Sequence, residues 1–158
     1  EEGRGFHYIM DGMNAERILI AAECIGDARW FTEKSSAYAS EREVFGQPIG
    51  KNQGVQFPIA RAHIQTEAAA LMVNHAADCF DQGQRPGSEA NRAKMLASGA
   101  GWAAADTCIQ THGGYGFAEE FDIERKFRET RLYQVAPIST NLNLSYVAEH
   151  FLELPPSF

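Results

Sequence analysis

The stretch NAERILIAAECIGDARWFTEKSSAYASER, residues 14–42, decides the fold class. It contains no proline, and its only glycine is Gly26. Its apolar side chains recur at steps of three and four residues, which is the spacing of one helix face. These are Ile18, Ala21, Ala22, Ile25, Ala28 and Phe31. The stretch therefore predicts a long helix with one buried side, capped at its N-terminus by Asn14.

Similar helical patterns recur along the rest of the chain. They predict long helices over residues 53–82, 88–111 (capped by Ser88) and 139–152, and shorter ones over 6–13 and 122–133. The short helix over 6–13 is expected to break near Gly12. No segment alternates apolar and polar residues at period two, so no β-sheet is expected. Together the segments predict an all-α fold, an up-and-down four-helix bundle with additional short helices.

Composition narrows the possible functions of the 158-residue chain. It carries 14 basic and 21 acidic residues, for a net charge of −7, and has no basic block. A nucleic-acid-binding surface is therefore not expected. No apolar run reaches the roughly 18 residues that a membrane span needs. Cys24, Cys79 and Cys108 lack metal-binding spacing, and we interpret them as buried thiols in a reducing compartment.

Common metal and nucleotide motifs are missing. A di-iron bundle needs Glu three residues before His, and none of the five histidines has one there. The His and Cys spacings do not suit zinc either, so no metal site is expected. The glycine-rich segment of residues 112–116 follows a predicted helix, whereas dinucleotide and P-loop motifs follow a strand.

Three polar segments remain: SEREVFGQPI (residues 40–49), QTHGGYGF (110–117) and RKFRETRLYQ (125–134). Taken singly, each has an ordinary structural interpretation. Arg42 would be a surface ion-pair residue, and the glycine pair would stop a helix. Arg125, Arg128 and Arg131 would form a solvated face paired with nearby glutamates.

Together, in this order and at these separations, the segments resemble the C-terminal domain of acyl-CoA dehydrogenases. That family shows Glu-Arg-x-x-Phe-Gly after its first long helix and Gln-x-x-Gly-Gly-x-Gly after its third. An Arg-rich helix ending in Tyr-Gln then leads into the active-site loop. The resemblance covers essentially all of the chain. It implies that residues 1–158 are a single C-terminal helical bundle domain of a longer flavoenzyme, with the N-terminal helical and middle β domains outside this sequence.

The resemblance also implies an FAD site that is shared between subunits. Arg42 matches the arginine on the FAD pyrophosphate, where a guanidinium can form paired hydrogen bonds to phosphate oxygens. The other positions that match the family's cofactor contacts are Phe45, Gln53, Gln110, Gly114, Ser139 and Asn141. Ser139 also suits the N-cap of the last helix.

The active-site loop departs from the commonest pattern of the family. Most members read Tyr-Gln-x-Tyr-Glu-Gly-Thr, with the Glu as catalytic base, whereas this chain reads YQVAPIS and places Pro137 there. Proline neither accepts a proton nor donates a backbone N–H. A minority of members, including the isovaleryl-CoA and long-chain enzymes, carry the base on the first long helix before an arginine. Glu16 matches that base; the alternative is that Glu16 stabilises the N-terminus of its helix.

The resemblance implies α,β-desaturation of an acyl-CoA thioester, by α-proton abstraction and β-hydride transfer to flavin. Asn14, Arg17 and Ala136 are expected near the substrate. Electron-transfer flavoprotein would be the electron acceptor, and the protein would be a homodimer or homotetramer in the bacterial cytoplasm or mitochondrial matrix. The isolated domain is expected to be inactive. The alternatives are an acyl-CoA oxidase and a non-catalytic helical scaffold that has lost the base.

Overall fold

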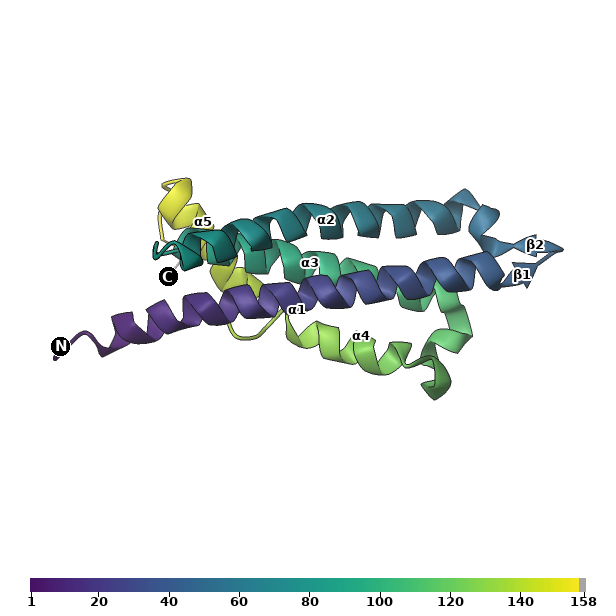
Figure 1. The fold of residues 1–158 in the computed structure, drawn as a ribbon, viewed down its shortest axis with the longest axis horizontal. Helices are drawn as coiled ribbons and strands as arrows, with labels where there is room; N and C mark the ends of the chain where they lie inside the picture. The colour runs from purple at the N-terminus through teal and green to yellow at the C-terminus, as the bar shows by residue number, and fades with distance from the viewer. Residues whose placement is uncertain (157–158) are drawn as a thin grey trace.

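A computed structural model describes residues 1–156 of the chain, and it is built almost entirely from helices (Figure 1). Three long helices lie side by side, with α2 antiparallel to the other two: α1 (Gly5–Glu41), α2 (Gln53–Asp81) and α3 (Gly87–His112). The shorter α4 (Ile123–Leu132) lies along α1 and α3, and α5 (Thr140–Phe151) packs on α3 at one end of the bundle. The predicted all-α bundle is confirmed.

Helix α1 is longer than expected, because it begins at Gly5 and continues through Gly12. The predicted separate helix over 6–13 is therefore wrong. One glycine inside a helix costs only about 1 kcal/mol relative to alanine, which is less than the cost of starting a second helix. The predicted Asn14 cap is wrong for the same reason: Asn14 is buried inside α1, and its side chain accepts from Arg17 Nη1 at 2.6 Å.

The core lies between α1, α2 and α3, and α3 contributes mostly alanine to it. Phe31 of α1 is fully buried there. The backbone of α1 comes close to Gly101 of α3, where an added Cβ would lie 3.4 Å from the carbonyl oxygen of Cys24. The alanines of α3 that are at most 4% exposed are Ala90, Ala93, Ala97, Ala100, Ala104 and Ala105. Small side chains on α3 therefore allow the long helices to approach closely.

A small hairpin interrupts the helical fold, so the prediction of no β-sheet is corrected. Strands β1 (Glu43–Val44) and β2 (Gln47–Pro48) pair antiparallel beyond the end of α1. Phe45 and Gly46 between them both have positive φ, at 55° and 76°. Two successive positive φ angles are typical of the tightest hairpin turn, and two-residue strands leave no room for an alternating sequence pattern.

The structure around α3 and α4 tests the predicted Ser88 cap and the predicted arginine face. Helix α3 begins at Gly87 after Pro86, so Ser88 is not the predicted cap, and its buried Oγ has no hydrogen-bond partner among the described residues. On α4, Arg128 pairs with Glu124 at 2.9 Å, as expected of a solvated face, while Arg131 lies over the Trp102 ring. After α3 the chain forms two 3-10 turns, η2 (Gly113–Phe117) and η3 (Glu119–Phe121).

Candidate functional site

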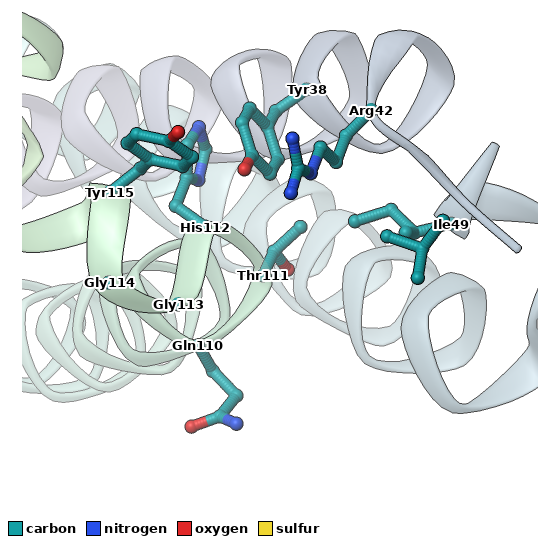
Figure 2. Close-up of a pocket in the computed structure, with 10 residues that line it drawn as sticks. Tyr38, Arg42, Ile49, Gln110, Thr111, His112, Gly113, Gly114 and Tyr115 are labelled. Carbon is teal, nitrogen blue, oxygen red and sulfur yellow. The ribbon is translucent and has the colours of Figure 1, made fainter.

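A pocket of about 480 Å³ lies at the hairpin end of the bundle (Figure 2). The last turn of α1 supplies Tyr38 and Arg42, and the α3–η2 junction supplies residues 110–115. Arg42 is exposed, and it forms no ion pair with a carboxylate within residues 1–156. The bundle thus brings the first two family-like segments together, although almost 70 residues separate them in the chain.

Aromatic rings form the wall beside Arg42. The rings of Tyr38 and His112 stack with their centroids 4.1 Å apart, and the Arg42 guanidinium lies 5.8 Å from the centre of the Tyr115 ring. Burial lowers the pKa of His112, whose Nδ1 lies 2.8 Å from the carbonyl oxygen of Cys108. His112 is therefore a neutral stacking partner at physiological pH, and the Arg42 side chain lies beside uncharged aromatic rings.

The glycines of η2 shape the pocket edge. Gly113 ends α3 with φ of +58°, a conformation that favours glycine. Gly114 is exposed, and a Cβ there would meet no atom within 4 Å, so its backbone is open to a ligand. Gly116 is different, because a Cβ there would come within 3.0 Å of the carbonyl oxygen of Ile109. The segment thus presents backbone at Gly114 and packs tightly at Gly116.

Three other predicted cofactor residues, Gln110, Phe45 and Gln53, lie around this end but do not converge on Arg42. The Gln110 side chain points away from Arg42, although the residue borders the pocket (Figure 2). Phe45 at the hairpin tip is fully exposed, and Gln53 is exposed at the start of α2. Sequence reasoning missed Tyr38, His112 and Tyr115. Tyr38 had a usable signal, because it lies four residues before Arg42 and so shares its helix face.

A second pocket of about 560 Å³ lies at the opposite end of the bundle. It joins the start of α1 to the loop before α5, and so brings Asn14 and Arg17 together with Pro137. The side chains that sequence reasoning missed here are Phe6, Met10, Met13, Asn91, Ile138, Leu142 and Tyr146. Residues 6, 10, 13 and 17 follow helical spacing, but the expected break at Gly12 hid that pattern.

Arg17 is the charged group of this second pocket, and it is only 2% exposed. Its Nη1 donates to Asn14, whereas its Nε has no partner within residues 1–156. Burial lowers the pKa of Arg17, and the Tyr146 and Glu16 charges oppose that shift. A buried guanidinium with an unused donor is costly, which suits a site where a ligand acceptor completes the hydrogen bonding.

Glu16 lies next to Arg17 on α1, but its side chain is exposed and does not line the second pocket. Because α1 begins eleven residues earlier, at Gly5, Glu16 does not stabilise the helix N-terminus. Ala136 is half-buried in the loop before Pro137, and Asn141 is exposed in the first turn of α5. Ser139 caps α5 as predicted, with its Oγ accepting from the Leu142 N–H at 3.3 Å.

Other ligand classes find little support in the described part of the chain. Residues 1–156 contain no group of three metal-ligating side chains, and no helix there has the length and apolarity to cross a membrane. All three cysteines are buried and unpaired, and burial raises the pKa of Cys24 to about 12 and that of Cys108 to about 11. The three thiols are thus buried, as interpreted from the sequence, and burial disfavours the reactive thiolate of Cys24 and Cys108.

Comparison with known proteins identifies the family of the chain. Residues 3–152 match the family model described as "Acyl-CoA dehydrogenase, C-terminal domain". The chain belongs to the acyl-CoA dehydrogenase family, within which it corresponds to that helical domain.

Individual relatives show how much of such a protein the chain represents. It is 37% identical over 152 residues to an acyl-CoA dehydrogenase of Bacillus subtilis, covering 96% of this chain and 40% of the relative. The butyryl-CoA dehydrogenase structure from Megasphaera elsdenii superposes with a TM-score of 0.92 at 30% identity, covering 96% of this chain and 40% of that one. PigA, solved with FAD and proline, gives 0.90 at 25% identity, covering 95% and 39%. The chain thus spans about two fifths of the length of these proteins.

Proposed function

We propose that this domain is part of an FAD-dependent acyl-CoA dehydrogenase and that its first pocket binds the diphosphate of FAD. The observation that carries the proposal is the position of Arg42 beside the open backbone of Gly114 in one pocket. An unpaired guanidinium and an exposed glycine without a Cβ together allow the close approach of phosphate oxygens. PigA, a structural relative, was solved with FAD.

The remaining matched residues have roles that fit their exposure. Phe45 and Gln53 would contact the adenosine part of the cofactor from the hairpin side, and Gln110 would contribute at the pocket border. The β1–β2 hairpin extends beyond the end of the bundle (Figure 1), and Phe45 in its turn is fully exposed. A large aromatic side chain in that position suits a surface completed by another domain or subunit.

The distance between the two pockets supports an FAD site shared between subunits. Arg17 and Arg42 lie 25 residues apart on one continuous helix, which corresponds to about 38 Å. That separation exceeds the length of an extended FAD molecule. The diphosphate site at Arg42 and the flavin contacts at Ser139 and Asn141 would therefore serve different cofactor molecules, which fits a homodimer or homotetramer.

The second pocket would hold the thioester end of an acyl-CoA. Arg17 and Asn14 supply buried polar groups there, and Met10, Ile138 and Leu142 line the pocket with apolar side chains that would pack against the substrate. Bound FAD would accept the hydride that leaves the β-carbon of the acyl group. The chain itself would supply the base for the α-proton, and Glu16 is our candidate.

Glu16 would act as the base only if the substrate enters beside α1, because its side chain is exposed and does not line the pocket. A substrate and the rest of the polypeptide would then enclose Glu16. The Arg17 guanidinium would remain close to the developing charge on the thioester oxygen. Electron-transfer flavoprotein would reoxidise the cofactor, and the three free thiols fit a bacterial cytoplasm or mitochondrial matrix.

The test uses the complete polypeptide that contains this domain. We expect it to purify with a flavin absorption spectrum and to lose that absorption when acyl-CoA thioesters are added without oxygen. A panel of straight and branched chains would identify the substrate class. A colourless protein that takes up no added FAD would refute the proposal. It would then favour the scaffold alternative, to which Pro137 at the usual base position points.

A further inference from the structure

Lys94 of α3 is a buried cation outside the set of residues discussed so far. Its side chain has no exposed surface, and its Nζ donates to the carbonyl oxygen of Ile138 at 2.7 Å. Burial lowers the pKa of Lys94, as does the Arg17 guanidinium, whereas the Cys24 thiol acts in the opposite direction. The ammonium thus lies in the core, bound to one backbone oxygen of a loop, with no carboxylate partner among residues 1–156.

Such a group does not serve stability alone. Transferring an ammonium from water into the core is costly, and an apolar side chain of similar volume usually stabilises a fold at least as well. What the lysine provides and an apolar residue does not is a directional bond to one carbonyl, which fixes the position of Ile138.

A second contact holds the same loop one turn further along α3. Gln134 Nε2 donates to the carbonyl oxygen of Ser98 at 2.6 Å, and the carbonyl of Gln134 accepts from the Thr140 N–H at 3.1 Å. The two anchors on α3, Lys94 and Ser98, are four residues apart and so lie on the same face of the helix. The loop of residues 134–138 is thus attached to α3 at both of its ends.

The loop faces the second pocket, where Pro137 and Ile138 form part of the lining. Pro137 has no N–H to offer, so the first donors that follow it are the N–H of Ile138 and then the N–H of Ser139. The Ser139 N–H shares its peptide unit with the Ile138 carbonyl oxygen that Lys94 holds. An ammonium at the oxygen of that unit also polarises its N–H, which strengthens it as a donor.

We propose that Lys94 is a positioning residue. Together with Gln134, it holds the loop of residues 134–138 in the geometry that presents the Ile138–Ser139 peptide to the reacting groups. This inference builds on the proposed function, but the order of the loop can be measured without it.

The experiment compares Lys94→Met and Gln134→Leu with Lys126→Met in the complete polypeptide. Lys126 is the matched control, because its Nζ pairs with buried Asp27 at 2.6 Å but anchors α4 to α1 and not the loop. Backbone hydrogen exchange would be followed for residues 134–139. We expect it to become about 10- to 100-fold faster in both test variants, the range for losing a strong hydrogen bond that controls local opening. In Lys126→Met it should stay near the wild-type rate.

Kinetics provide a second readout. In both test variants, kcat for the acyl-CoA should fall by a larger factor than KM rises, since the loop would be displaced while the binding surface remains. Loop exchange in Lys94→Met no faster than in Lys126→Met would overturn the inference. If Lys94→Met does not fold, wild-type exchange in Gln134→Leu has the same meaning. A protein without flavin would refute the proposed function, and the exchange measurement would still decide the role of Lys94.

Discussion

Replacing Arg42 with alanine removes a guanidinium that contributes little to the stability of the folded domain. The side chain is exposed, and its ring contact with Tyr115, at 5.8 Å, is the interaction that the fold provides for it. An exposed contact of this kind contributes about 0.5–1 kcal/mol. The thermal midpoint should therefore fall by no more than about 2–4 °C.

The effect of Arg42→Ala on cofactor binding should be much larger. A hydrogen bond to a charged partner contributes about 1.5–3 kcal/mol, which corresponds to a roughly 10- to 150-fold higher Kd for FAD. The assay is a fluorescence titration of the apoprotein with FAD, using the complete polypeptide. Arg29→Ala is the control, because Arg29 is another exposed arginine of α1 and pairs with Glu67 on α2. A Kd for Arg42→Ala equal to that of Arg29→Ala would refute the phosphate assignment.

Three further predictions concern other parts of the domain. Glu16→Gln should slow flavin reduction by about 10²–10⁴-fold without changing flavin content, and stopped-flow reduction at the wild-type rate would exclude Glu16 as the base. Gly116→Ala should destabilise the fold by about 1–3 kcal/mol, because its Cβ would press on the backbone of Ile109; a urea midpoint equal to the wild type would contradict the packing described here. Burial lowers the pKa of His112 below its ordinary value of 6.5, so the unfolded chain binds the proton more readily and stability should fall as the pH drops below about 6.5. His112→Phe should reduce this loss of stability at low pH, which denaturation curves at several pH values would measure. The same pH dependence of stability in His112→Phe and wild type would contradict the reasoning.

The helices were predictable from sequence because their signal is local. The apolar spacing from Ile18 to Phe31 follows the turn of the helix itself, and the structure buries most of those side chains. The helix boundaries that were predicted from single residues were wrong. Gly12 and Asn14 have capping or breaking tendencies of about 1 kcal/mol, which the packing of a long helix overrides.

The candidate site was predictable in part. Arg42 and Gly114 were found through their motif, and the structure places both at one pocket. His112 was missed because its stacking on Tyr38 depends on how α1 and α3 meet, which no local pattern encodes. Lys94 was missed for a related reason: a lysine in an alanine-rich helix reads as a solvent-facing residue until its orientation is known.

The alanine-lined interior of α3 has a consequence for mutational mapping. Alanine scanning measures the importance of a side chain by removing it, and at the six buried alanines of α3 there is nothing to remove, since these residues already end at Cβ. Such a scan would therefore not test these positions at the centre of the bundle. Substitutions that add volume, such as Ala97→Val or Ala104→Leu, would instead force α1 and α2 away from α3. The buried face of α3 should therefore tolerate the loss of side-chain volume better than its gain. The most damaging variants at the centre of the domain should be those that enlarge a residue.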